Sequence, residues 1–326
     1  AYLSPRLNIS YAIDKVTTLR GGTGVYYQSP GYEKLIDAQV FYDLSEEKAA
    51  RLEAERSIHY ILGAERWLSN DLIARVETYY KQFSNLIVQE KLTGYRYEYY
   101  PYDPNNTDPT YLRDPDNWYR SSTKLPYDSV TATPVNGAKG YAYGFELFLE
   151  KKAVNPSQKF SGWISYSLSY ANRQRDGLTT PFRYDQRHSV NLVANYKILS
   201  WLELGARFNF ASNFPVTLPT GIKPRIVGDS LAVLPVLDIV QFDFDFGDET
   251  NRFSTKKPDY HRLDIRATAY TKFWNVDWAF YLDVVNVYNR QNIVGYDFYI
   301  DDALKVKVKP IGQFPILPTI GVTARF

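Results

Sequence analysis

The stretch LPTIGVTARF (residues 317–326) closes the chain, and from Pro318 onward its apolar and polar side chains alternate. Pro318, Ile320, Val322, Ala324 and Phe326 are apolar, and the residues between them are Thr, Gly or Arg. Successive side chains of a strand point to opposite faces, so the stretch predicts a strand with one apolar face. A soluble sheet and a membrane barrel both contain such strands. The length at which the rest of the chain repeats the pattern decides between them.

The same alternation recurs about eleven times along the chain. Many of these segments run for ten to fifteen residues, whereas strands of globular sheets usually have about 5–6. A tilted strand needs about 9–11 residues to cross a membrane. The sequence therefore predicts an all-β fold, a transmembrane antiparallel up-and-down β-barrel. The apolar faces of these segments, beyond which most of the segments extend, lie at 7–13, 17–27, 58–64, 72–80, 141–149, 164–170, 190–198, 202–210, 263–269, 276–284 and 318–326.

The connectors between these segments alternate between short and long. In a meander, this places every short turn at one end of the sheet and every long loop at the other, as in outer-membrane barrels. In the first long connector, 45–56 predicts a short helix with Ser45 as its N-cap, and in the last, 306–309 predicts an extended ribbon. The short connectors are 14–15, 69–71, 153–157, 199–200 and 274–275, and the long ones are 28–52, 88–138, 174–184, 212–259 and 291–316.

Composition excludes several classes of protein. With 38 Lys and Arg against 36 Asp and Glu, the formal net charge of +2 gives no reason to expect a nucleic-acid partner. No apolar run approaches the roughly 18 residues of a membrane-spanning helix. The absence of Cys excludes disulfides, thiolate metal sites and a Cys nucleophile. Met and a signal peptide are also absent, as in a mature chain or an internal fragment.

Charges of both signs occupy the faces opposite the apolar ones. A charged side chain facing lipid at mid-bilayer costs roughly 2–4 kcal/mol, so the apolar faces should contact lipid and the charged faces the lumen. A soluble barrel would need the reverse, an apolar lumen ringed by very long strands. Near strand ends, Tyr141, Tyr143, Tyr170 and Tyr196 suit interfacial aromatic girdles. The candidate lumen residues are Arg75, Glu77, Glu146, Glu203, Arg207, Asp264, Arg266 and Asp283.

Aromatic residues gather in the long connector 88–138. Such side chains can stack on a sugar or an aromatic chelator, although ordinary loop packing would also place them there. The Asp- and Asn-rich stretch 103–117 matches no EF-hand spacing, so a solvated loop is expected there rather than a calcium site. The candidate ligand-binding residues are Tyr95, Tyr97, Tyr99, Tyr100, Tyr102, Trp118 and Tyr119.

The three histidines, His59, His188 and His261, lie far apart in the sequence, and no metal site is predicted from them. The neighbours His188 and Ser189 raise the alternative of a barrel hydrolase. Adjacent residues of a strand face opposite sides, so these two cannot form a nucleophile–base pair. No catalytic residue and no cofactor is therefore predicted.

Several segments resemble, in order and spacing, the barrel of TonB-dependent outer-membrane receptors, in a style closest to Bacteroidetes-like bacteria. The resemblance implies a bacterial outer-membrane location and uptake of a large, scarce nutrient: a metal chelate, cobalamin, a glycan or a peptide. It also implies a plug, the TonB energy-coupling protein, outer-membrane lipid and a surface lipoprotein as partners. The segments are AERSIHYILGAERWLSNDLIARVETYYKQFSNLI (54–87), GYAYGFELFLEKK (140–152), YDQRHSVNLVANYKILSWLELGARFNFASNFPVT (184–217), YHRLDIRATAY (260–270), YLDVVNVYNRQNIVGYDF (281–298) and LPTIGVTARF (317–326).

Parts of that family's pattern are missing from residues 1–326. The family has an amino-terminal plug with a coupling box and about 22 strands, whereas the chain shows neither plug nor box and about half the strands. An open sheet would leave edges at 7–13 and 319–326 unpaired, and each unsatisfied backbone group in lipid costs several kcal/mol.

A fragment of a longer chain is favoured over a barrel completed by a partner chain. The terminal strand should pair on one side with 276–287, and on the other with a strand outside this sequence. The rival functions are a passive porin, a barrel enzyme such as a lipid hydrolase, and a soluble β-rich binding protein.

Overall fold

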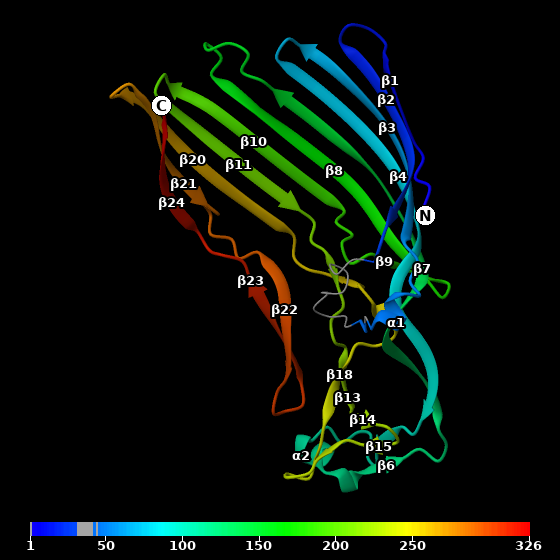
Figure 1. The fold of residues 1–326 in the computed structure, drawn as a ribbon. Coiled ribbons are helices and arrows are strands. Elements are labelled where there is room, and N and C mark those ends of the chain that lie inside the picture. Colours follow the sequence, from blue (N-terminus) through cyan, green and yellow to red (C-terminus); the bar gives the residue numbers. More distant parts are fainter. Residues whose placement is uncertain (1, 31–41, 44) are drawn as a thin grey trace.

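A long, curved antiparallel sheet dominates the computed structural model, which describes residues 2–30, 42–43 and 45–326 (Figure 1). Residues 31–41 and 44 of the connector predicted at 28–52 lie outside the described residues. Eleven strands follow one another in the order β1-β2-β3-β4-β7-β8-β10-β11-β20-β21-β24, and β9 pairs with β8 off this path. Neighbours in the sheet are thus successive long strands of the chain. The predicted up-and-down meander is confirmed.

Most of these strands begin and end within a few residues of the predicted segments, whereas β4 and β7 extend much further toward the loop between them. Figure 1 shows the short turns at the top of the sheet and the long loops at the bottom, which confirms the predicted asymmetry. The bounds are β1 (Arg6–Ala12), β2 (Thr17–Gln28), β3 (Glu55–Ser69), β4 (Leu72–Arg96), β7 (Leu125–Lys151), β8 (Phe160–Arg175), β9 (Leu178–Pro181), β10 (His188–Leu199), β11 (Leu202–Ala211), β20 (Tyr260–Phe273), β21 (Val276–Val285) and β24 (Leu317–Arg325).

The terminal strand β24 lies at one margin of the sheet and β1 at the other (Figure 1). As predicted, β24 pairs with β21, in a register that runs from Asp277 opposite Arg325 to Val285 opposite Leu317. Within the described residues, no ladder joins β24 to β1. The sheet is therefore an open trough, and a closed eleven-stranded barrel is not formed.

The apolar face of the sheet is exposed rather than packed in a core. Leu62 is 66% exposed and Ile320 is 84% exposed, and Leu7, Ile9 and Leu282 are also exposed. Among the described residues, the buried apolar side chains are few and scattered over several elements. A soluble protein does not leave so large an apolar surface in water. The sheet has the two-faced character predicted for a lipid-facing wall.

A row of tyrosines crosses this apolar face on four adjacent strands. Tyr60, Tyr80, Tyr143 and Tyr170 are successive cross-strand partners from β3 to β8. The rings of Tyr143 and Tyr170 are stacked with centroids 5.0 Å apart. Interfacial tyrosines mark the boundary of a bilayer, so the loop ends of the strands project beyond this row.

A second aromatic group lies at the turn end of the same face. Phe160 of β8 is the cross-strand partner of Tyr196, and Phe273 stacks on Trp278 at 4.8 Å. The length of β8 between Phe160 and Tyr170 suits the roughly 9–11 residues of a spanning strand. Together the two aromatic groups define the membrane-spanning part of the sheet.

The prediction of an irregular stretch at 88–138 is wrong at both of its ends. Strands β4 and β7 remain paired as far as Arg96 opposite Leu125, well beyond the tyrosine row. Register shifts between Phe83 and Leu86 and again between Gln89 and Lys91 interrupt the apolar–polar alternation. A bulge shifts the apolar–polar alternation of side chains but leaves the two strands paired. The predicted strands therefore ended where the alternation ended, before the true ends of the ladder.

The helix predicted at 45–56 is also shorter than expected. Helix α1 (Glu46–Ala49) covers only part of the predicted range, and Glu55 already belongs to β3, where it pairs with Gln28 of β2. Among the described residues, no helix is long and apolar enough to cross a membrane.

The remaining elements belong to the long loops, and the predicted ribbon at 306–309 is confirmed as the β22–β23 hairpin. They are β5 (Tyr99–Pro101), α2 (Pro109–Arg113), η2 (Pro115–Asn117), β6 (Trp118–Arg120), β12 (Pro215–Val216), β13 (Gly221–Pro224), β14 (Ile226–Val227), β15 (Ser230–Leu231), β16 (Val233–Leu234), β17 (Ile239–Val240), β18 (Phe242–Asp245), η3 (Glu249–Asn251), β19 (Thr255–Lys256), β22 (Ile293–Ile300) and β23 (Val306–Gly312).

Candidate functional site

The face opposite the apolar one is concave. The Tyr79 hydroxyl on β4 donates a hydrogen bond to Ser169 Oγ on β8 at 2.9 Å, although β7 lies between the two strands. Gly144 of β7 separates them, and a Cβ there would lie 2.8 Å from the Tyr79 hydroxyl. Side chains two strands apart converge in this way only on the inner side of a curved sheet. This inner surface is the candidate lumen.

Ion pairs cover much of the inner surface. Arg75 Nε lies 2.5 Å from Glu65 Oε2. Arg266 binds both oxygens of Asp283, at 2.5 and 2.6 Å. The bidentate form fixes both side chains against the wall. Arg75, Arg266 and Asp283 thus pair across strands, one of the two roles considered for the predicted lumen residues.

The other predicted lumen residues have different surroundings. Asp264 binds Arg262 at 2.9 Å. Glu203 and Arg207 have no ion pair within the described part of the chain. Glu77 and Glu146 are direct cross-strand partners, and both are exposed on the trough surface without an ion pair to any described residue. Like charges directly opposite each other destabilise a sheet. The wall therefore holds an uncompensated acidic pair.

The predicted aromatic cluster forms the tip of the loop between β4 and β7. Hairpin β5–β6 pairs Tyr100 with Tyr119, which places both rings on one face, 5.8 Å apart. The Tyr102 ring lies 5.3 Å from Tyr119 and is 66% exposed. These three tyrosines (Tyr100, Tyr102 and Tyr119), called the tyrosine trio below, are accessible to a ligand.

Three of the other predicted aromatic residues contact neighbouring residues, and the fourth is exposed on β4. The Tyr99 hydroxyl donates to the Asp229 carbonyl at 3.1 Å. Trp118 Nε1 donates to the Leu112 carbonyl at 2.9 Å. Tyr97 packs against two cations, with Arg120 Cζ 4.2 Å from its ring centroid and Lys124 Nζ 5.4 Å from it. Tyr95 is exposed. The structure thus divides the predicted cluster into an open face and a face that packs on neighbouring loops.

Contacts join this tip to the other long loops. Lys124 Nζ lies 2.6 Å from Asp229 Oδ2 of the β14–β15 turn. The Trp118 ring lies 6.1 Å from Phe242 of β18, and the next phenylalanine of that strand, Phe244, lies 6.1 Å from Phe298 of β22. The three loops therefore form one loop module, shown at the bottom of Figure 1.

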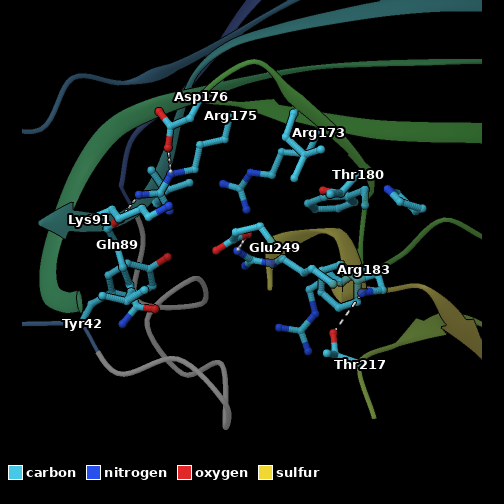
Figure 2. Close-up of a pocket in the computed structure, with 17 residues that line it drawn as sticks. Tyr42, Gln89, Lys91, Arg173, Arg175, Asp176, Thr180, Arg183, Thr217 and Glu249 are labelled. Carbon is cyan, nitrogen blue, oxygen red and sulfur yellow. Dashed lines mark hydrogen bonds and ion pairs between the residues drawn. The ribbon is translucent and has the colours of Figure 1, made fainter. Parts of the chain in front are cut away.

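A cavity of about 470 Å³ lies between the loop end of the sheet and this module (Figure 2). In Figure 2, Arg173 and Arg175 enter from the end of β8, while Tyr42 and Gln89 lie on another side. Glu249 reaches into its middle from the loop after β11. The volume lies within the roughly 300–1,000 Å³ of small-molecule sites. Its cationic lining residues are Lys91, Arg173, Arg175, Arg183 and Arg252.

Arg173 is the most constrained of these cations. Its Nη2 donates to the Ile87 carbonyl at 2.5 Å, while its buried Nε has no hydrogen-bond partner. It lies beyond the tyrosine row, outside the membrane-spanning part. Burial lowers the pKa of Arg173 to about 10; Tyr42 opposes this reduction, and the nearby Arg252 and Arg175 add to it. Burial also raises the pKa of Tyr42, so its phenol remains a neutral donor.

The sequence reasoning missed this cavity. The alternation of β8 continues past Tyr170, so Arg173 and Arg175 fall on the same face as Ser165, Ser167 and Ser169. The predicted segment 164–170 ends before this continuation. Arg183 joins the cavity from the loop after β9 and Arg252 from the loop between β11 and β20, and nothing in their local sequence indicates that they line a common cavity.

The histidines bind neighbouring aromatic residues. His188 Nδ1 lies 2.9 Å from the Tyr166 hydroxyl, and His261 Nδ1 lies 2.7 Å from the Tyr288 hydroxyl. Ser189 Oγ accepts from Asn191 on the concave side, beside a second cavity of about 440 Å³. The histidine and the serine thus face opposite sides of β10, as predicted. Among the described residues, no group of three potential metal ligands occurs.

Comparison with known proteins gives one family match. A family model described as "TonB dependent receptor-like, beta-barrel" matches residues 1–289. No curated protein sequence is significantly similar to the chain.

Solved structures share the fold. The unliganded ferric citrate transporter FecA is 16% identical with a TM-score of 0.57, and the match covers 99% of this chain and 38% of FecA. The FrpB iron transporter from Neisseria meningitidis is 13% identical with a TM-score of 0.54, covering 98% and 39%. The ferripyoverdine receptor from Pseudomonas aeruginosa is 11% identical with a TM-score of 0.51, covering 98% and 32%. The chain thus spans less than two-fifths of each of these proteins.

Proposed function

Because the chain belongs to the TonB-dependent receptor-like β-barrel family, we propose that it forms part of the barrel wall of an outer-membrane receptor. The receptor imports a large, scarce nutrient and draws its energy from the TonB system. The observation that carries this proposal is the two-faced trough, apolar and exposed outside, charged inside, with an aromatic row at each membrane boundary. Transport through such a wall needs no catalytic residue.

The open trough must be completed for this function. We propose that strands outside residues 1–326 pair with the free edges of β1 and β24 and close a barrel of about 22 strands. The physical reason is that unpaired backbone groups in lipid cost several kcal/mol each. The greater length of the structural neighbours supports the same arrangement.

The inner wall is proposed to hold a plug, through which TonB would act. Glu77 and Glu146 offer two adjacent carboxylates without a compensating cation in the described part of the chain. An Arg or Lys of the plug would relieve their repulsion. Glu203 and Arg207, also without ion pairs among the described residues, provide further polar contacts for it. Outer-membrane lipid would contact the opposite face.

The loop module is the proposed site of ligand capture. The tyrosine trio offers exposed rings, and the cavity beside Arg173 lies between the module and the trough. The candidate nutrients are a metal chelate, cobalamin, a glycan or a peptide. Several structural neighbours are iron-chelate receptors by name, which favours a chelate. A surface lipoprotein that covers the loops remains a proposed partner.

The test is nutrient uptake by cells that express the intact receptor, with and without a functional TonB. Uptake should be saturable and should be lost in the tonB-deficient strain, while the receptor remains in the outer membrane. The control is diffusion of small sugars into liposomes that contain the purified receptor. Sugar diffusion at the rate of an open pore, with uptake independent of TonB, would instead identify a passive porin.

A further inference from the structure

Among the described residues that line the cavity beside Arg173, cationic side chains outnumber acidic ones. The five cations named above face two lining carboxylates, Asp176 and Glu249. Arg175 pairs with Asp176 at 3.3 Å, and Arg252 pairs with Glu249 at 3.5 Å. Lys91 binds Asp128 at 2.7 Å. Each of these three cations therefore has one carboxylate.

Arg173 differs from those three cations, because it has no carboxylate partner in the described part of the chain. Its one hydrogen bond in the structure goes to a backbone carbonyl, and its buried Nε has no acceptor. An unsatisfied buried donor costs about 1–3 kcal/mol, and a desolvated charge beside other cations costs more. Such an arrangement is expected where an incoming anion supplies the missing acceptor.

The chemistry of the lining defines the anion. Guanidinium groups bind carboxylate and phosphoryl oxygens through paired N–H donors. Tyr42 adds a neutral O–H donor on another side of the cavity. A neutral glycan would leave the charge of Arg173 uncompensated. The cavity of about 470 Å³ also suits a small acidic group better than a whole macrocycle.

We infer that this cavity is a subsite for an acidic ligand, which places a carboxylate or phosphoryl group on Arg173. The inference rests on the proposed function, since it assigns a substrate class to the same receptor. It narrows the candidate nutrients to acidic chelates and other acidic compounds, and it assigns neutral glycans no role at this position.

The experiment is calorimetric titration of the purified intact receptor in a neutral detergent with four probes. The polyanions inorganic pyrophosphate and tricarballylate test the phosphoryl and carboxylate forms of the acidic group. Acetate provides a single charge and maltose provides none. The two polyanions should bind, acetate should bind more weakly, and maltose should not bind. The stronger of the two binders identifies the preferred acidic group.

Substitutions locate the binding. Arg173→Gln should weaken polyanion binding by about tenfold or more, and Arg173→Lys should retain part of it. Arg225→Gln is the matched control, because Arg225 lies in a long loop outside the cavity, 4.0 Å from Asp243. Circular dichroism and the heat-dependent gel shift of a folded barrel verify that each variant is folded.

Two outcomes would overturn the inference: no binding of either polyanion up to roughly 10 mM, or equal affinity in the folded Arg173→Gln variant. Failure of the proposed function is a separate result. TonB-independent uptake would contradict the transport proposal, whereas Arg173-dependent pyrophosphate binding would still establish the subsite.

Discussion

The Tyr281 ring lies directly across Gly321, its cross-strand partner on the edge strand β24. A Cβ on Gly321 would come within 2.3 Å of the Tyr281 ring. Gly321→Ala should therefore destabilise the edge of the sheet by about 1–3 kcal/mol through overpacking. Urea unfolding of the receptor in detergent measures this change. Gly221→Ala is the control, because no atom lies within 4 Å of the Cβ it would add, and an equal loss in both variants would contradict the explanation.

Tyr102 and Tyr99 should respond differently to truncation. Tyr102→Ala removes an exposed ring of the tyrosine trio, so it should weaken nutrient binding while the stability of the loop is unchanged. Tyr99→Ala removes the hydrogen bond to the Asp229 carbonyl, so it should loosen the loop module, which faster hydrogen exchange over β14 and β15 would report. Tyr299→Ala, an exposed tyrosine of β22, should change neither quantity.

Trp118 should hold the tip on the neighbouring loop. Trp118→Ala removes its contact with Phe242 and the hydrogen bond to Leu112. An aromatic pair contributes about 0.5–1.5 kcal/mol beyond its buried area. Limited proteolysis should therefore cut the loop between β5 and β6 faster in this variant. Unchanged cleavage would mean that the three loops do not depend on one another.

Polyanion binding should depend on pH through Arg173. The pKa of this side chain is lowered to about 10 by burial, so it remains charged at neutral pH. Affinity for an anion that stays fully ionised should therefore be constant from about pH 7 to 9 and should fall as pH rises through 10. A bound anion favours the charged form, which moves the decline to slightly higher pH. Calorimetric titration of tricarballylate, whose carboxyl groups are ionised above about pH 7, tests the prediction, and a decline that is complete below pH 9 would point to another group.

The acidic pair on the wall should control the fit of the plug. The double variant Glu77→Gln and Glu146→Gln removes the charge that a cationic plug residue would meet. We expect the lumen to become leaky, so that cells take up a large antibiotic such as vancomycin and grow less in its presence. Glu47→Gln, on the exposed helix α1, is the control and should have no effect.

The two-residue period of the apolar–polar alternation and the length of the alternating segments were enough to predict the wall of the trough from the sequence. Leu62 and Leu282 face outward and Arg75 and Asp283 face inward because strand geometry leaves two directions for each side chain. The same reasoning failed beyond Phe83, where bulges change the period without ending the ladder.

The site was less accessible to sequence reasoning than the wall. Tyr100 and Tyr119 are near enough in sequence to suggest a cluster, but the hairpin register decides which rings are exposed. Arg173 lies near the end of strand β8, whereas Arg252 lies in the loop between β11 and β20, and the two meet only in three dimensions. Their proximity follows from how the long loops pack on one another, and local sequence patterns do not predict that packing.

The pairing of β4 with β7 continues through three register shifts and connects the loop tip to the wall of the trough. One hairpin carries the tyrosine trio at its tip and Glu77 and Glu146 on the proposed plug-facing wall. The register shift between Phe83 and Leu86 lies between these two sites. In the receptor that we propose, ligand capture at the tip and plug contact at the wall would therefore be connected through the backbone hydrogen bonds of a single hairpin.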